Sequence, residues 1–206
     1  MMFTDIIWDF DGTLFDTYPP MTEAFYKALK EYGIEEDKEE ILRKLKISVG
    51  NAADFFRDKY ELGEELVSRF WFYEKNMDKH SIHLFQDVKE VCSRIKATGR
   101  KNYIYTHRGD STFEYLNING MDDLFDVIVT KSQGLRGKPH GDGFIYIIEK
   151  YDLDRKNVLC IGDRDIDILA AKDAQVSSCF FISNGCEGTV EADFKIYKME
   201  QLLEIL

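Results

Sequence analysis

The sequence predicts an α/β fold in which a Rossmann-like parallel sheet is sandwiched by helices and carries an inserted α-helical domain. After residue 80, apolar β-rich runs alternate with helical patterns, an order typical of parallel sheets. Between about residues 17 and 80 the pattern is helical only. With 206 residues and a hydrophobic content of 44%, the chain is long enough for one such core plus a small insertion.

The expected strands are short apolar runs that end at a polar residue or a turn: 5–10, 101–106, 126–130, 157–162 and 178–182. The helices expected between and around them are 86–98, 110–119, 142–151 and 165–174. In the helical stretch, the expected helices are 20–32, 35–45, 49–60 and 62–78. Pro19 and Pro20 fit the start of the first of these, because the first turn of a helix does not need their missing N–H groups.

We therefore expect an α/β domain formed by residues 1–16 and 81–206, and a helical cap formed by residues 17–80. The cap would rise from the loop after the first strand and so cover that end of the sheet. A group of aromatic residues is expected to form its core and to make it pack against itself or another subunit: Phe55, Phe56, Tyr60, Phe70, Trp71, Phe72 and Tyr73. A monomer and a homodimer both fit this pattern.

Charge and composition exclude several classes of partner. The net charge of −11 argues against binding to nucleic acid, whose phosphates attract basic surfaces. The N-terminus lacks the basic and apolar regions of a signal peptide, and no apolar run approaches the roughly 20 residues needed to span a membrane. The four cysteines, Cys92, Cys160, Cys179 and Cys186, show no metal-type spacing. These features together favour a cytoplasmic protein.

Two carboxylates mark the end of the first expected strand. Asp9 and Asp11 stand one residue apart where the run Ile6-Ile7-Trp8 meets Gly12. Side chains at positions i and i+2 of a strand point the same way, so both carboxylates can face one small volume. Two anions this close repel each other unless one is protonated or a cation lies between them. The pair therefore predicts a bound metal ion, a shared proton, or both.

Polar residues also follow three later strands, at the sheet edge where ligands of α/β proteins bind. Thr106 and His107 come after one strand and before a helix start, a combination that favours anion binding. Lys138 lies in a glycine-containing loop and can neutralise a phosphate or a carboxylate. Asp163 and Asp167 follow the strand Val158–Gly162 and supply the oxygen ligands that Mg²⁺ needs.

Taken in order, Asp9-Phe-Asp11-Gly-Thr, Thr106, Lys138-Pro139 and Gly162-Asp163-x-x-x-Asp167 resemble the four-motif signature of the haloacid dehalogenase-like superfamily. The resemblance covers nearly the whole chain. The helical insertion after the first motif is similar to the cap of the branch that contains phosphoglycolate phosphatase and β-phosphoglucomutase. The resemblance implies a Mg²⁺-dependent phosphatase that acts on a small phosphorylated metabolite, such as phosphoglycolate or a sugar phosphate.

The resemblance also implies a role for each motif residue. Asp9 would attack phosphorus and form an aspartyl-phosphate, while Asp11 would protonate the leaving oxygen and then activate water. Mg²⁺ would bind the Asp9 carboxylate, the Asp11 backbone carbonyl and Asp163, with Asp167 ordering its waters or ligating it directly.

The remaining motif residues would bind the substrate. Thr106 and the backbone N–H of His107 would hold the phosphoryl oxygens, and Lys138 would balance charge between Asp9 and the phosphate.

Three alternatives share this fold. A haloacid dehalogenase also uses a first Asp but needs neither the second Asp nor Mg²⁺, so Asp11 and Asp163 argue against it. A phosphomutase of the β-phosphoglucomutase type often has Val where Thr13 stands, and Thr13 resembles the phosphatases. A non-catalytic binding or regulatory module would most simply have lost one of the motif acids, and all are present.

The chain also departs from the branch pattern in three places. Residues 106–108 are Thr-His-Arg where Thr-Asn-Lys is frequent, so that His107 and Arg108 could add substrate contacts. His140-Gly-Asp-Gly replaces an acidic or proline-containing stretch after Lys138-Pro139, and Gln175 stands where the branch usually has Gly.

Overall fold

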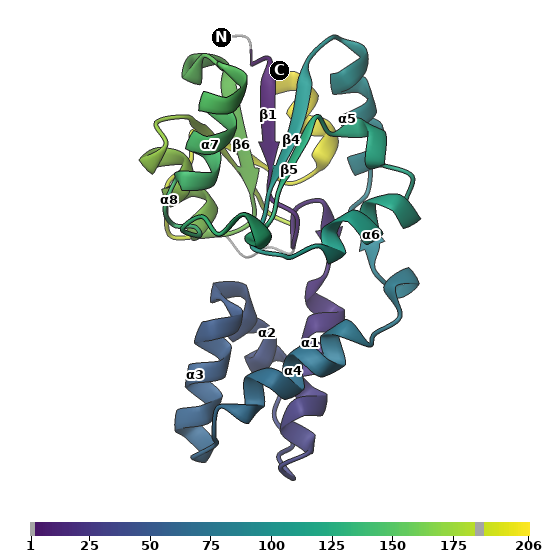
Figure 1. Cartoon of the computed structure of the whole chain (residues 1–206), viewed down its shortest axis with the longest axis vertical. Coiled ribbons are helices and arrows are strands. Elements are labelled where there is room, and N and C mark those ends of the chain that lie inside the picture. The colour runs from purple at the N-terminus through teal and green to yellow at the C-terminus, as the bar shows by residue number, and fades with distance from the viewer. Residues whose placement is uncertain (1–2, 184–187) are drawn as a thin grey trace. The chain divides into compact units, whose positions relative to one another are not determined.

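The computed structural model describes residues 3–183 and 188–206; Cys186 lies outside this range. The chain folds as two compact units (Figure 1). The sheet unit is built from the residues up to Phe15 and from Leu84 onward, and the helical unit is Asp16–His83. The chain passes between them through two short paired strands, β2 (Phe15–Asp16) and β3 (His83–Leu84).

The sheet unit contains a six-stranded parallel sheet in the order β5-β4-β1-β6-β7-β8. Its strands are β1 (Asp5–Trp8), β4 (Lys101–Tyr105), β5 (Val127–Val129), β6 (Val158–Gly162), β7 (Ser177–Phe181) and β8 (Phe194–Ile196). The chain adds β4 and β5 on one side of β1, and then β6, β7 and β8 on the other. The carboxyl end of β1 is therefore the point at which the strand order reverses, which is the ligand position in open α/β sheets.

Helices cover both faces of this sheet, which confirms the predicted fold class. They are α5 (Val88–Ala97), α6 (Ser111–Ile118), α7 (Asp142–Tyr151), α8 (Asp165–Asp173) and α9 (Leu202–Ile205). Figure 1 shows α7 and α8 on one side of the strands and α5 on the other. Short 3₁₀ turns lie at Lys79–Ser81, Asp122–Leu124, Lys131–Gln133, Arg155–Asn157 and Met199–Gln201. The strand β8 is not among the expected ones, because three residues carry too short an alternation to detect.

The core on each face follows from strand alternation. On the α7 side, Ile7, Tyr103 and Cys160 pack in one cluster with Phe144. On the α5 side, buried Asn102 accepts a hydrogen bond from the Trp8 indole at 3.0 Å and donates to two backbone carbonyls. Both polar atoms of this side-chain amide therefore have hydrogen-bond partners, as buried polar groups usually do.

The helical unit consists of α1 (Tyr18–Lys30), α2 (Lys38–Ile47), α3 (Val49–Tyr60) and α4 (Glu65–Lys75). Asp37 and Ser48 cap α2 and α3 by accepting from backbone N–H groups. The core gathers around Phe25, whose ring lies 5.5 Å from that of Phe56 and 5.4 Å from that of Phe70.

The expectation that all seven aromatic residues form this core is wrong for two of them. Trp71 and Phe72 are 44% and 61% exposed, whereas Phe70 is fully buried. Consecutive helix positions are about 100° apart around the axis, so three neighbours cannot all face the same core. Among the described residues, none of the helices has the length and apolar character needed to cross a bilayer.

Gln175 ends the turn after α8 in the left-handed conformation, with φ of 57°. Its side chain is exposed and does not require this backbone conformation. Its N–H donates to the Lys172 carbonyl at 3.0 Å. A side chain with a Cβ is strained in this conformation, whereas glycine is not.

We predict that Gln175→Gly raises the free energy of unfolding of the sheet unit by about 0.5–1 kcal/mol, because relief of left-handed strain exceeds the entropy that glycine adds to the unfolded chain. Gln175→Ala is the matched control, since it removes the same polar group but keeps the Cβ. Urea unfolding in a Trp71→Phe background would measure this, because Trp8 then reports on the sheet unit alone. Equal stability of the Gly and Ala variants would contradict the strain argument.

Candidate active site at the strand ends

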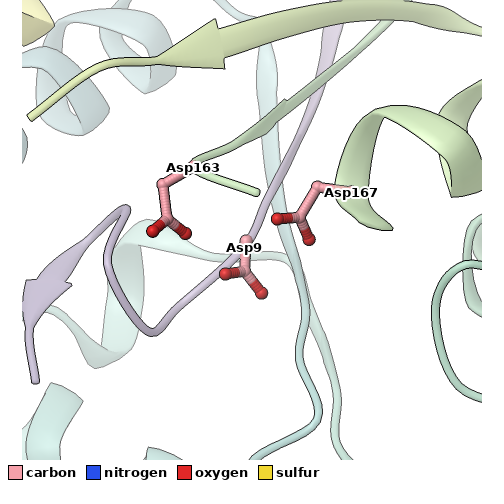
Figure 2. Close-up of side chains that lie close together, drawn as sticks. All are labelled: Asp9, Asp163 and Asp167. Atoms are coloured by element: carbon pink, nitrogen blue, oxygen red, sulfur yellow. The ribbon is translucent and has the colours of Figure 1, made fainter. Parts of the chain in front are cut away.

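Three carboxylates meet where β1 and β6 end. One oxygen from each of Asp9, Asp163 and Asp167 lies within 4.8 Å of the others, and Figure 2 shows their side chains converging. Asp9 follows β1 directly and is anchored by its N–H, which donates to the Ile161 carbonyl at 2.8 Å. Neighbouring parallel strands therefore bring together residues that lie more than 150 positions apart.

Local sequence explains how the acids fit at these strand ends. Gly12 adopts φ of 83°, which closes the tight loop after β1. A Cβ on Gly162 would lie 2.3 Å from the Cβ of Asp167, so only glycine lets the first turn of α8 approach the end of β6. The Thr13 hydroxyl donates to Oδ1 of Asp163 at 3.4 Å, a contact that a valine at this position could not make.

Lys138 joins two of the three acids. Its Nζ lies 2.6 Å from Oδ1 of Asp9 and 2.6 Å from Oδ1 of Asp167, and its side chain is fully buried. Burial alone would lower the pKa of Lys138, but Asp167 and Asp9 outweigh that effect and hold it raised. The lysine is therefore a permanent cation inside the acidic cluster.

The side chain of His107 holds the Lys138 loop in place. Its Nε2 accepts a hydrogen bond from the Lys138 N–H at 2.7 Å. A Cβ on Gly137 would lie 2.6 Å from this nitrogen, so the glycine makes room for the ring. Burial, followed by Lys138 and Arg164, lowers the pKa of His107 to about 4. The ring is therefore neutral near pH 7 and can act as an acceptor. His140, by contrast, is exposed.

Asp11 pairs with a different cation from Asp9. Arg108 donates to Oδ1 of Asp11 from Nε at 2.9 Å and from Nη2 at 2.8 Å, and its Nε lies 3.3 Å from Oδ2. The guanidinium is buried between the rings of Phe10 and Tyr115. The Asp11 carboxylate is thus directed toward Arg108. The acidic side chain that raises the pKa of Asp9 is Asp167. Binding of a metal ion by the Asp11 backbone carbonyl stays a prediction.

Thr106 lies beside this pair at the end of β4. Its buried hydroxyl accepts a hydrogen bond from the Arg108 N–H at 3.0 Å and keeps its own proton to donate. The anion-binding role of Thr106 and of the His107 N–H stays a prediction. The sequence singled out Arg108 only as a departure from a motif, although a basic residue two positions after the expected strand 101–106 is the signal that could have identified it.

A second arginine, Arg164, was missed by sequence reasoning. It stands between Asp163 and Asp165, and its guanidinium lies 3.6–3.9 Å from carboxylate oxygens of Asp9, Asp163 and Asp167. Its backbone N–H donates to Oδ2 of Asp167 at 3.1 Å. With Asp11 included, four carboxylates and three basic side chains share the site, which leaves it one negative charge in excess.

The electrostatic properties of Asp9 and Asp167 differ although both are fully buried. Burial, reinforced by Asp167, raises the pKa of Asp9 to about 6. Burial also acts to raise the pKa of Asp167, but Lys138 and Arg164 outweigh it and lower that pKa. Oδ2 of Asp9 has no hydrogen-bond partner among the described residues. Such a buried, unsatisfied carboxylate oxygen is suited to binding a cation.

We predict that Asp9→Asn stabilises the metal-free protein at neutral pH. The raised pKa means that the folded protein holds the Asp9 proton between about pH 4 and pH 6, where the unfolded chain has released it. The wild type therefore loses stability as the pH rises through this window, and an uncharged asparagine does not. The variant should gain roughly 1–3 kcal/mol relative to the wild type by pH 7 and little near pH 4.

Urea unfolding in the presence of EDTA at both pH values measures this difference. Asp54→Asn, at an exposed position on α3, is the control for removal of one negative charge. A stability difference that does not change with pH would contradict the assignment of the penalty to the Asp9 charge.

Comparison with known proteins agrees with this geometry. The family model described as haloacid dehalogenase-like hydrolase matches residues 6–181. The chain is 26% identical to the pyrophosphatase PpaX of Bacillus anthracis, with 100% of this chain and 97% of that protein covered.

Two solved structures are also similar. A hydrolase from Streptococcus pneumoniae TIGR4 is 29% identical, with a TM-score of 0.66 and coverage of 99% of this chain and 100% of that chain. A predicted phosphoglycolate phosphatase from Haemophilus somnus is 24% identical, with a TM-score of 0.83 and coverage of 100% and 98%. The order of the strand-end motifs and the matched length show that the chain belongs to the haloacid dehalogenase-like hydrolases.

Proposed function

We propose that this hydrolase is a Mg²⁺-dependent phosphatase of small phosphorylated metabolites and that it works through an aspartyl-phosphate on Asp9. The observation that carries the proposal is the buried Oδ2 of Asp9, which has no hydrogen-bond partner while Oδ1 is held by Lys138. One oxygen of the nucleophile is thus fixed, and the other is left to react or to bind metal. Phosphatase chemistry is in keeping with the family and with the pyrophosphatase relatives.

The donor set fits a hard divalent cation, because carboxylate oxygens are the ligands that Mg²⁺ prefers. Asp9 and Asp163 would hold the ion, together with the Asp11 carbonyl. Both oxygens of Asp167 already accept hydrogen bonds, from Lys138 and from the Arg164 N–H, so Asp167 is better placed to orient neighbours than to ligate. Bound Mg²⁺ would neutralise phosphate charge. With it, the net charge of the site would change from −1 to +1, which suits an anionic substrate.

The protein residues would carry the two chemical steps. A carboxylate oxygen of Asp9 attacks phosphorus, the bond to the leaving oxygen breaks, and Asp11, which must enter this step protonated, gives that oxygen its proton. Asp11 then takes a proton from water, which attacks the phosphorus and releases inorganic phosphate and the Asp9 carboxylate. Thr106 and the His107 N–H would hold the equatorial oxygens, and Lys138 would keep Asp9 in place.

The substrate candidates are pyrophosphate, by likeness to the relatives, and phosphoglycolate or a sugar phosphate. The helical unit would act as a cap that shields the intermediate from unwanted acceptors. Buried, unpaired thiols at Cys92, Cys160 and Cys179 suit the reducing cytoplasm, where we place the protein. A phosphomutase of the β-phosphoglucomutase type is the second candidate, and the contact between Thr13 and Asp163 favours the phosphatase over it.

We predict that phosphate release from a panel of these compounds requires both Mg²⁺ and Asp9. Asp9→Asn should lower kcat by at least about 10³-fold, because an amide cannot replace the carboxylate nucleophile. Asp54→Asn controls for the charge change, and the same assay with EDTA tests the metal. Formation of an isomeric phosphate ester without phosphate release would instead support the mutase. Full activity of Asp9→Asn would contradict the mechanism.

We also propose that Arg108 positions Asp11 as the acid. Arg108→Gln should lower kcat/KM by about 10–100-fold for an alkyl phosphate but by much less for p-nitrophenyl phosphate, whose leaving group needs little protonation. Asp11→Asn should show the same selectivity, and the double variant should lose little more than either single one. Arg94→Gln, exposed on α5, is the control. Equal losses on both substrates would contradict the positioning role.

A further inference from the structure

Two aromatic rings from the end of β4 contact the loop that carries Lys138. The Tyr105 hydroxyl donates to the Arg136 carbonyl at 3.1 Å, and Nε2 of His107 accepts from the Lys138 N–H at 2.7 Å. The centroids of the two rings lie 6.4 Å apart, and their planes meet at 78°. The loop backbone is therefore held by one hydrogen bond at Lys138 and by a second one two residues earlier.

Glycines on both sides of Lys138 make room for these rings. A Cβ on Gly137 would lie 2.6 Å from Nε2 of His107. A Cβ on Gly143, in the first turn of α7, would lie 2.3 Å from the Tyr105 ring. Protein interiors are closely packed, so a larger residue at either glycine would push a ring or the loop out of place. The loop and the two rings therefore fit together as one packed arrangement.

The Tyr105 ring also lies beside the charged end of Lys138. The lysine Nζ is 5.0 Å from the centre of that ring, while it contacts Asp9 and Asp167 at 2.6 Å. The face of an aromatic ring attracts a cation. The aliphatic part of lysine is flexible, so the place that its Nζ reaches depends on where its backbone is held. Tyr105 and His107 together fix that backbone and one side of the ammonium group.

The hydrogen bond to Lys138 also determines which nitrogen of His107 carries the proton. Burial lowers the pKa of His107 to about 4, so the ring is neutral near pH 7. A neutral imidazole has one N–H group and one acceptor nitrogen. Because Nε2 is the acceptor, the proton must be on Nδ1. The arrangement therefore requires one defined tautomer of this histidine.

We propose that Tyr105 and His107 form a clamp that positions Lys138 against Asp9, so that both are positioning residues for the reaction. The inference rests on the proposed function, in which Lys138 keeps the nucleophile in place. The backbone N–H of His107 would hold a phosphoryl oxygen in the same reaction. One residue would therefore set the position of the phosphate through its backbone and that of the lysine through its ring.

Kinetics with p-nitrophenyl phosphate and Mg²⁺ test the clamp. His107→Leu removes the acceptor and should lower kcat by about 10–100-fold, with KM changed by less than about 3-fold, because the nucleophile is misplaced while the other phosphate contacts remain. His107→Gln should recover most of this loss, since its amide oxygen can reach the position of Nε2. His140→Leu is the matched control, because this histidine lies in the same loop and is exposed.

Tyr105→Phe tests the second half of the clamp, because it removes only the hydroxyl group that holds the Arg136 carbonyl. It should lower kcat by about 3–10-fold, since the ring and its packing stay in place. Combined with His107→Leu, it should cost little more than His107→Leu alone, because both act on one loop. Fully multiplicative losses would contradict the idea that the two rings work as a unit.

Nitrogen-15 NMR of the histidine rings gives a readout that does not depend on activity. At pH 7, His107 should be in the Nδ1–H tautomer, and its signals are identified by their absence in His107→Gln. An Nε2–H tautomer would overturn the clamp. So would an active wild type whose kcat is matched by folded His107→Leu, or a Gln variant no better than Leu. No phosphate release by the wild type would instead overturn the proposed function, and the positioning role with it.

Discussion

The buried bridge from Lys138 to Asp9 and Asp167 is the interaction on which the rest of the site depends. Two fully buried carboxylates would not stay ionised side by side without a cation between them. Lys138 supplies that cation from a position 129 residues after Asp9 and 29 before Asp167, and so ties together the ends of β1 and α8. Its loop is held in turn by the neutral ring of His107, for which Gly137 leaves space.

This arrangement resolves the contrast between an acidic protein and a proposed anionic substrate. The chain carries a net charge of −11, yet three basic side chains converge at the carboxyl end of β1, the point where the strand order reverses. Low-dielectric walls make each of these charges more effective than it would be in water. Together with the proposed metal ion, these cations would outweigh the four carboxylates, so that the local field attracts a phosphate even when the surface as a whole repels anions.

Much of the fold and several of the site residues were predictable from the sequence, because short local patterns indicate strands and the residues at their ends. The parallel sheet followed from alternating apolar runs, and Asp9, Thr106 and Asp163 could be placed at strand ends. What could not be predicted is how the side chains pair. The two-residue spacing suggested that Asp9 and Asp11 act on each other, but β1 ends at Trp8 and Arg108 binds Asp11 from the neighbouring loop. Such pairings depend on the register between strands about 100 residues apart. The exposure of Trp71 and Phe72 likewise depends on which side of α4 meets α1.

The two arginines show that charge alone does not define a role in this site. Arg108 is packed between two rings and held to Asp11 by hydrogen bonds of 2.8 and 2.9 Å, a geometry that fixes the direction of a carboxylate. Arg164 is partly exposed, and its guanidinium lies 3.6–3.9 Å from carboxylate oxygens of three acids, which are ion-pair distances. The first arrangement suits a residue that must keep a proton-transferring group in place. The second spreads one positive charge over three neighbouring acids. The raised pKa of Asp9 shows that the basic side chains only partly compensate its burial and its repulsion from Asp167. A bound metal ion would relieve the remaining repulsion.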